Sequence, residues 1–488
     1  MKVSVITSFL MVCLIGQAEN TPPAPIGPLP QPKQVEWQKM ETYAFVHYGL
    51  NTFNDSEWGY GDADPKTFNP SRMDVEQWVQ TFKQAGMKGV IIVAKHHDGF
   101  TLWPSSLTDY NITRSSYNGP KNKDGKVDVL AELRKACDKY GLKMGVYLSP
   151  WDRNHAEYGH QAYVDYYHKQ LTDLVTNYGP LFEVWLDGAN GGDGYYGGAR
   201  ETRKIDRRNY YNFPKIHSII LEHQPQAIIF SDGGPGCRWV GNEHGEAGIP
   251  NWSFLRKNEV YPGYPNNQEL KTGHPDGDTW IPAECDVSIR PGWFYHPKED
   301  SKVKTPEQLA DIYYQSVGRN ATFLLNFPID REGRVNAIDS ANAVRFRQII
   351  DEDLRTNLLR KAKVTASSVR GKKYSAKNLT DGKWDTYWAT PDGVNTGEVT
   401  FTFKKPTKID RLLLQEYIPL GQRVRRFVVE AFIDGKWQPI DPGEPFGNIG
   451  YKRILRFTAI ETTSIKVSFP ESRGPLCINN IAAYFANR

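Results

Sequence analysis

The sequence is poor in features that define several common protein classes. It contains only 5 cysteines in 488 residues and no C-x-x-C pair, which is too few for a disulfide scaffold. A Cys237–Cys285 bridge is one arrangement open to it, but we expect free, buried thiols. The net charge of +4 is small and dispersed, so nucleic acid is not expected as a partner. No G-x-G-x-x-G follows the first predicted strand and no G-x-x-x-x-G-K occurs, which argues against nucleotide binding.

Long apolar runs are also scarce, with one exception at the N-terminus. A positively charged start, an apolar run at 3–15 and the small-x-small triplet at 16–18 predict a signal peptide over residues 1–18. A lipoprotein anchored at Cys13 is the alternative, but the residue before Cys13 is larger than such sites usually carry. No other stretch approaches the ~20 apolar residues that span a bilayer. We therefore expect export to the periplasm or outside the cell, with no transmembrane segment.

Strand and helix patterns alternate through the next part of the chain. Apolar runs predict strands at 43–48, 89–94, 143–148, 181–186, 227–230 and 322–326, and helical patterns follow them at 127–140, 161–176, 210–223, 306–317 and 340–354, with an earlier one at 75–85. At least six βα units predict either a barrel or a doubly wound sheet. The missing nucleotide fingerprint and the long polar loops favour an α/β fold of the (β/α)₈-like barrel type over residues 19–355.

The texture changes beyond about Leu359. Short alternating strands at 397–403, 410–416, 425–432, 465–469 and 481–485 replace the helices, and Asp434-Gly435 reads as a hairpin turn. We expect an all-β sandwich domain over residues 356–488.

Polar side chains stand at the ends of the first four predicted strands. His47 ends the first, His96 and His97 follow the second, Tyr147 ends the third and Asp187 ends the fourth. An isolated Asp-Gly pair is usually a turn, but four polar strand ends in succession predict an active site, because barrel enzymes place theirs at this rim. The alternative is a metal site made by the three histidines and Asp187. No H-E-x-x-H or helical His pair supports that alternative, and we expect no catalytic cofactor.

A carboxylate among His, Tyr, Trp and Arg suits glycoside hydrolysis, which uses two carboxyl groups. The high aromatic content of 12% also leans towards carbohydrate, because aromatic faces pair with the apolar faces of sugars. Three downstream residues in aromatic-rich loops are candidate partners for Asp187: Glu243, Glu246 and Glu284. Spacing alone does not choose among them.

The chain resembles the α-L-fucosidases of glycoside hydrolase family 29 over residues 35–355. The stretches that carry the resemblance are 45–49, 95–100, 145–149, 184–188 and 318–326. The resemblance implies a retaining exo-hydrolase that removes terminal α-L-fucose, with Asp187 as nucleophile. It further implies that fucose is bound by His47, His96, His97 and Tyr147, with Arg238 near the sugar and Glu57 and Trp58 as further pocket residues. Arg238 and the histidines would keep Asp187 ionised.

The general acid/base follows from a finer resemblance. Residues 238–243 and 285–296 are similar to segments of the branch that cleaves α-1,3/1,4-linked fucose. We therefore favour Glu243 as acid/base, with Glu284 second and Glu246 third. The rest of a fucosylated oligosaccharide or glycoprotein would contact Glu284, Arg290 and Trp293.

The C-terminal part resembles a discoidin-like (F5/8 type C) carbohydrate-binding module, through residues 378–388. Such modules often hold a structural Ca²⁺, for which the oxygen ligands here would be Asn378, Asp381, Asp385 and Thr386. A polar turn without an ion is the alternative. Two other functions stay open: a secreted fucose-binding lectin without hydrolytic activity, and an adhesion protein led by the sandwich.

Overall fold

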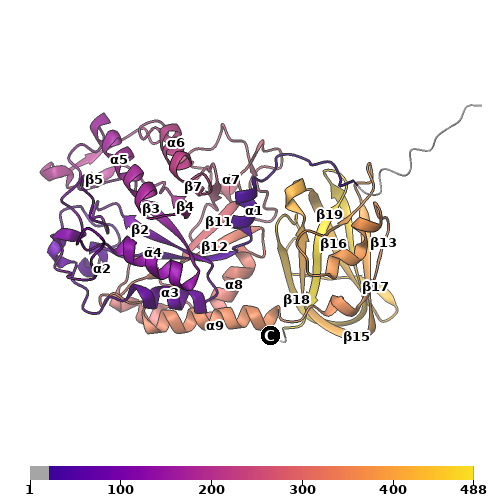
Figure 1. The fold of residues 1–488 in the computed structure, drawn as a ribbon. Coiled ribbons are helices and arrows are strands. Elements are labelled where there is room, and N and C mark those ends of the chain that lie inside the picture. Colours follow the sequence, from indigo (N-terminus) through magenta and orange to yellow (C-terminus); the bar gives the residue numbers. More distant parts are fainter. Residues whose placement is uncertain (1–20, 487–488) are drawn as a thin grey trace, which may run out of the picture.

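The computed structural model describes residues 21–486, which form a barrel and an antiparallel β-sheet domain side by side (Figure 1). The predicted signal peptide and the alternative anchor at Cys13 lie outside the described residues. Among the residues described, no helix is long and apolar enough to cross a membrane. The four described cysteines are all buried and free: Cys137, Cys237, Cys285 and Cys477.

Eight parallel strands close the barrel, which confirms the predicted fold class. They are β1 (Thr42–His47), β2 (Gly89–Lys95), β3 (Lys143–Leu148), β4 (Leu181–Trp185), β7 (Ile228–Ser231), β8 (Cys237–Trp239), β11 (Ala283–Ser288) and β12 (Ala321–Pro328). Their order around the barrel is β1-β12-β11-β8-β7-β4-β3-β2. Most strand residues are buried, as expected for parallel strands packed inside and out.

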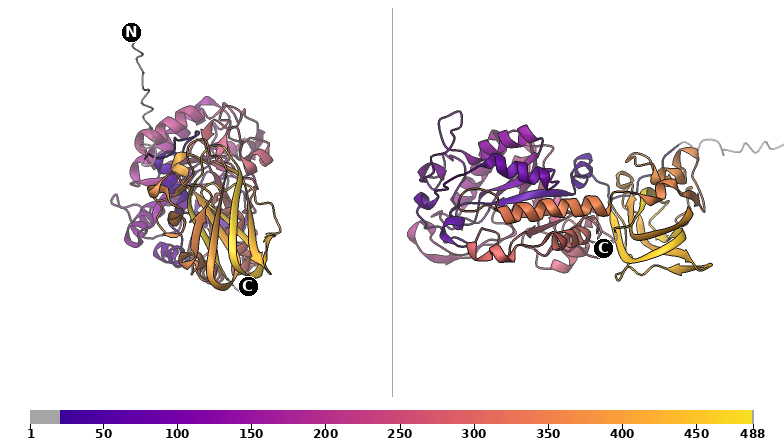
Figure 2. Two further views of the ribbon diagram at one scale, coloured as in Figure 1. Left: turned by 90° about the vertical axis from the view of Figure 1, so that its right-hand side faces the viewer. Right: turned by 90° about the horizontal axis from the view of Figure 1, so that it is seen from below.

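Six main helices lie outside this barrel (Figures 1 and 2): α3 (Val75–Gln84), α4 (Val129–Tyr140), α5 (Gln161–Asn177), α6 (Phe213–His223), α8 (Pro306–Ser316) and α9 (Ala337–Asp353). Local sequence sets their ends. The Asp74 carboxylate caps α3 by accepting from the Gln77 amide at 2.9 Å, and Gly141, at φ +71°, ends α4. β8 and β11 were not predicted. The long segment between them holds only one short helix, α7 (Asn267–Thr272), and two short strands, β9 (Phe254–Leu255) and β10 (Thr279–Trp280).

The C-terminal domain is all-β, as predicted. Its strands are β13 (Lys363–Ala366), β14 (Trp388–Ala389), β15 (Gly397–Glu416), β16 (Val424–Ile433), β17 (Lys436–Pro439), β18 (Arg453–Ser472) and β19 (Cys477–Tyr484). The strands predicted at 397–403 and 410–416 are one long strand, β15, whose pairing with β18 shifts register at irregularities. Asp434 and Gly435 have φ of +51° and +79°, so the predicted hairpin turn joins β16 and β17.

The two domains share a hydrogen-bonded junction. The backbone N–H of Asn251 in the barrel domain donates to Asn448 Oδ1 at 3.0 Å, and the backbone N–H of Ser253 donates to Gln422 Oε1 at 2.9 Å. Residues 21–30 also run along the C-terminal domain before α1 (Pro32–Gln38), where the Ile26 amide donates to the Leu420 carbonyl at 3.0 Å. The segment between β8 and β11 is therefore tied directly to the second domain.

Candidate active site

The carboxyl ends of the barrel strands surround one pocket. The first four strands bring together all five of the strand-end residues singled out in the sequence. The complete lining is Phe45, His47, Trp58, His96, His97, Tyr147, Trp185, Asp187, Ala189, Glu243, Asp286 and Trp293. The pocket thus combines a large aromatic surface with three carboxyl groups and three imidazoles.

Asp187 follows β4 directly and is held by two hydrogen bonds. Its Oδ2 accepts from the Tyr147 hydroxyl at 2.9 Å, and its Oδ1 accepts from the Ala189 amide at 2.6 Å. Burial raises the pKa of Asp187, whereas these two donors oppose the rise because they favour the charged form. The donors also fix the direction in which the carboxylate points.

The three histidines are neutral hydrogen-bonding groups. Burial lowers the pKa of His47 and of His97 to about 3, and that of His96 well below its usual range. His47 Nδ1 lies 2.8 Å from Asn326 Oδ1, so the proton is on Nδ1 and Nε2 is an acceptor. Because all three histidines are neutral, none of them supplies a positive charge that would keep Asp187 ionised, which differs from the expectation based on the sequence.

His97 follows the same pattern as His47. Its Nδ1 lies 2.7 Å from the Ser149 hydroxyl, which itself donates to the Trp151 carbonyl, so His97 Nδ1 is the donor in this pair. Its Nε2, 4.0 Å from Asp187 Oδ2, is then an acceptor. Asn326 and Ser149 were not assigned a role from sequence, although both lie in stretches that carry the family resemblance.

Glu243 reaches the pocket from the segment after β8. Its Oε2 accepts from the Trp293 indole N–H at 3.3 Å. Loss of water around the carboxyl raises its pKa, the Trp293 bond opposes this, and the negative charges of Asp187 and Glu57 raise it further. A carboxyl that keeps its proton near a second, charged carboxylate can act as an acid.

Arg238 is not among the residues that line the pocket. Its side chain is fully buried and donates to the carbonyls of Leu270, Ile281 and Trp252 and to Asn251 Oδ1. β8 is only three residues long, and this side chain points into the packing of the β8–β11 segment. The guanidinium of Arg238, which was expected beside Asp187, therefore donates to backbone carbonyls of the protein interior.

Glu284 and Arg290 are likewise buried away from the pocket lining. Glu284 accepts from the Trp185 indole at 2.8 Å and from the Tyr43 hydroxyl, inside the barrel. Arg290 forms a two-bond pair with Asp339, both bonds 2.8 Å long. Neither residue is available to contact a glycan in this arrangement. Glu246, the third acid/base candidate, pairs with Lys271 at 3.0 Å.

Asp286 lines the pocket but was not selected from the sequence. Alternate residues of a strand face the same side, so Glu284 and Asp286 both point into the barrel, and Asp286 is nearer the carboxyl end of β11. It accepts from the Trp239 indole at 2.8 Å. Burial and the negative charges of Glu243 and Glu284 raise its pKa well above the usual range. Strand alternation could have identified it, had β11 been recognised.

The alternative metal site is not formed by the three histidines. Among the residues described, the one cluster of His, Cys, Asp or Glu close enough to share an ion is Glu183, Cys237 and Glu284. Two indole N–H groups and a tyrosine hydroxyl already donate to its carboxyl groups, which suits a buried carboxyl pair better than a cation site.

A second candidate cation site was predicted in the C-terminal domain. There the Thr386 hydroxyl donates to Asp381 Oδ2 at 2.7 Å, and the Asn378 amide donates to the carbonyls of Lys373 and Tyr387. Asp385 is exposed in the same turn. The oxygen ligands fit Ca²⁺, and the Asp381 carboxylate keeps free lone pairs beside its bonds from Thr386 and the Lys383 amide.

A parallel barrel whose strand ends and following loops bring three carboxyl groups, Asp187, Glu243 and Asp286, into one aromatic pocket indicates the class of glycoside hydrolases. Comparison with known families gives the particular family. The family model described as Alpha-L-fucosidase matches residues 27–346, and the F5/8 type C domain model matches residues 363–483. The chain belongs to the glycoside hydrolase family 29 α-L-fucosidases, and it is an enzyme of the glycosidase class.

Several relatives resemble the chain over nearly its whole length. "Putative alpha-L-fucosidase 1" of Oryza sativa subsp. japonica is 41% identical over 461 residues, covering 93% of this chain and 85% of the relative. "Alpha-L-fucosidase 1" of Arabidopsis thaliana is 39% identical, with 98% and 92% covered. A Ruminococcus gnavus GH29 fucosidase solved in complex with fucose has a TM-score of 0.84 and 34% identity, covering 96% of this chain and 98% of that one.

Proposed function

We propose that the enzyme is a retaining exo-α-L-fucosidase in which Asp187 is the nucleophile and Glu243 the acid/base. Asp187 attacks the anomeric carbon of fucose while Glu243 protonates the departing glycosidic oxygen. Glu243 then takes a proton from water, whose oxygen displaces Asp187 and releases fucose with its configuration retained. The observation that carries the proposal is that both carboxyl groups line one pocket, in contrasting environments.

The contrast between these environments supports the division of roles. Asp187 receives two donors, which favour the charged form that a nucleophile needs. Burial raises the pKa of both carboxyl groups, but the donor to Glu243, the Trp293 indole N–H, is more distant at 3.3 Å, and the charge of Asp187 adds to the rise at Glu243. This favours the protonated form that an acid needs. The acceptor nitrogens of His47 and His97 suit fucose hydroxyl groups, and Trp58, 54% exposed at the pocket, offers an apolar face to the sugar.

We further propose that the substrates are glycans with α-1,3- or α-1,4-linked fucose, of Lewis type. Support comes from the resemblance of residues 238–243 and 285–296 to that branch, and from Trp293 and Glu243 meeting at the pocket. Incubation with an α-1,3-fucosylated Lewis trisaccharide and with α-1,2-fucosylated lactose tests this. Fucose release from the first substrate alone is expected. Release from both would overturn the linkage proposal and leave the activity standing.

The remaining proposals concern the chain outside the barrel. We propose that the N-terminal segment directs export to the periplasm or beyond, on the strength of its signal pattern, and that the C-terminal domain binds carbohydrate. We also propose that Ca²⁺ binds at Asn378, Asp381, Asp385 and Thr386. Melting temperatures measured with Ca²⁺ and with a chelator test the last point: an increase with Ca²⁺ that is lost in Asp381→Asn supports it, and identical values contradict it.

A further inference from the structure

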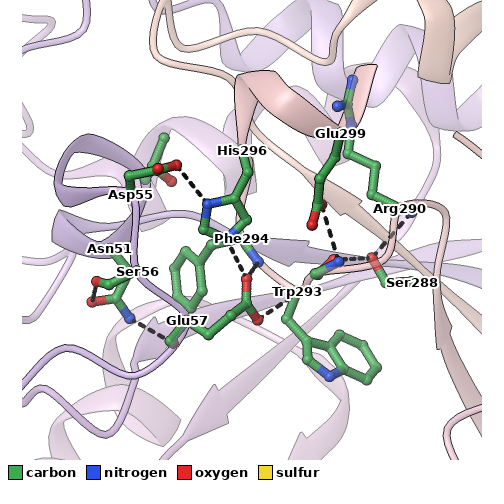
Figure 3. A network of polar contacts seen from close by, with 12 residues as sticks. Asn51, Asp55, Ser56, Glu57, Ser288, Arg290, Trp293, Phe294, His296 and Glu299 are labelled. Carbon is green, nitrogen blue, oxygen red and sulfur yellow. Dashed lines mark hydrogen bonds and ion pairs between the residues drawn. The ribbon is translucent and has the colours of Figure 1, made fainter. Parts of the chain in front are cut away.

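A partly exposed polar network joins two loops beside the pocket (Figure 3). The first loop is residues 55–58, which follow α2 (Leu50–Asn54), and the second is residues 289–296, which follow β11. The Glu57 carboxylate accepts from the Trp293 amide at 2.8 Å and from the Phe294 amide at 3.1 Å. Its Oε1 also lies 2.6 Å from His296 Nε2. One side chain of the first loop thus contacts three residues of the second loop, Trp293, Phe294 and His296.

His296 is held between two carboxylates of the first loop. Its Nδ1 lies 2.7 Å from Asp55 Oδ1, and its Nε2 faces Glu57. An imidazole donates from both nitrogens only when it is protonated. Hydrogen bonds to both carboxylates accordingly raise the pKa of His296 against the opposing effect of burial, with Glu57 and Glu299 adding attraction.

Other charges face this network as well. Arg331 Nη2 lies 3.8 Å from Asp55, and Lys298 also favours the charged form of that carboxylate. The loops are linked by alternating charges rather than by apolar packing alone. Because the folded-state pKa of His296 is raised, this link is fully present below the ordinary histidine pKa, where the Asp55 carboxylate is still ionised, and weakens as pH rises through the raised pKa of His296.

Trp293 connects the network to the pocket. Its amide is held by Glu57, its carbonyl accepts from Asn326 Nδ2 at 2.9 Å, and its indole N–H donates to Glu243. The backbone N–H and carbonyl of Trp293 are therefore both hydrogen-bonded, which positions the indole next to the proposed acid/base.

The Glu57 carboxylate has little capacity left for a sugar. A carboxylate offers about four lone-pair sites, and three are used by Trp293, Phe294 and His296. The approach to the second loop is also close: a Cβ built on Gly292 would lie 2.5 Å from Glu57 Oε1. Any larger residue at 292 would displace this carboxylate.

We infer that Glu57 and His296 are positioning residues, which act on catalysis by holding Trp293 so that its indole N–H meets Glu243. This inference rests on the proposed acid/base role of Glu243. It assigns Glu57 a role different from the direct sugar contact that the family resemblance implies.

The test compares kcat/KM for two substrates in the Glu57→Gln and His296→Gln variants. The fucosylated trisaccharide has a leaving group that needs protonation, whereas α-L-fucosyl fluoride needs little. Misplacement of Glu243 should reduce kcat/KM for the trisaccharide on the order of 10-fold, a fraction of a full general-acid effect, and change the value for the fluoride by less than about 2-fold. Equal losses on both substrates would overturn the inference, because they indicate lost sugar binding or a collapsed pocket.

Two controls separate the possible failures. Glu243→Gln must itself lose activity on the trisaccharide but not on the fluoride. If Glu243→Gln lacks this selectivity, the acid/base proposal is refuted rather than the positioning role. Glu299→Gln keeps an oxygen that can accept from the Gly292 amide, a 3.1 Å contact in the same loop. It removes a negative charge that favours protonated His296 but no hydrogen bond to His296 or Trp293, so it should retain near wild-type rates on both substrates.

A double-mutant cycle tests the route through the indole. In a Trp293→Phe background, Glu57→Gln should cost less than about 2-fold on the trisaccharide, because contacting residues that act in series are not additive. The same loss as in the wild-type background would show that Glu57 acts by another route, and would overturn the inference.

Discussion

The rim of the barrel consists of two arcs that hold their functional groups in different ways. The first arc, at the ends of β1–β4, carries His47, His97, Tyr147 and Asp187, each fixed by a neighbour on or next to a barrel strand. The second arc, formed by the segments after β8 and β11, carries Glu243 and Trp293, which contact each other through loops. The proposed nucleophile, Asp187, is thus positioned by the barrel strands, and the proposed acid/base, Glu243, by contacts between loops.

Contacts between loops, unlike those of the barrel strands, can be changed without disturbing the barrel. The second arc is also tied to the C-terminal domain through Asn251 and Ser253, whereas no comparable tie is found for the first arc among the contacts described for residues 21–486. The second domain therefore supports the segment that carries Glu243 while lying beside the barrel.

The largest effect is expected at Asp187 in the first arc. Asp187→Asn preserves size and removes the negative charge, so we expect kcat to fall by about 10⁴-fold or more, as for other nucleophilic carboxylate and hydroxyl groups. Initial rates on the trisaccharide and on α-L-fucosyl fluoride should fall together, because both substrates need the nucleophile. A variant that retains the fluoride rate would refute the assignment.

A smaller and more selective effect is expected at Glu243 in the second arc. Glu243→Gln should lower kcat/KM for the trisaccharide by about 10²–10⁴-fold and affect the fluoride far less. Glu246→Gln is the matched control, since Glu246 pairs with Lys271, and it should stay near wild type. If Glu246→Gln carries the selective loss instead, the acid/base has been assigned to the wrong residue.

The sequence predicted the first arc better than the second for a physical reason. The strands of the first arc are continuous apolar runs, so their ends and the residues that follow them can be read directly. β8 is three residues long and β11 follows an irregular segment, so neither gives a recognisable pattern. Arg238 and Arg290 therefore appeared as candidates through the family resemblance, and Glu284 also as an acidic residue in an aromatic-rich loop, although their side chains point into the protein interior.

The burial of Arg238 predicts a change in stability rather than in binding. Arg238→Met would leave the carbonyls of Leu270, Ile281 and Trp252 without this donor, so we expect the free energy of unfolding to fall by about 3 kcal/mol. Denaturant unfolding measures the loss, and KM for the folded enzyme should be unchanged. An increase in KM without a loss of stability would instead indicate that Arg238 contributes to substrate binding.

The smallest kinetic effect is expected at the contact between Trp293 and Glu243, where Trp293→Phe should lower kcat/KM for the trisaccharide on the order of 10-fold. The indole N–H favours the charged form of Glu243, so Trp293→Phe should raise the pKa of that carboxyl. The acid then keeps its proton to higher pH, and the alkaline limb of kcat/KM should move upward. A limb that moves downward, or stays in place, would mean that this hydrogen bond does not govern the acid.

The most direct test of the account is to trap the covalent intermediate and locate it. The enzyme would be incubated with a 2-fluorinated α-L-fucosyl fluoride, digested, and the labelled peptide sequenced by mass spectrometry. We predict one added fucosyl group, attached to Asp187. A label on any other carboxylate, or fucose released with inverted configuration and no label, would contradict the division of roles between the two arcs.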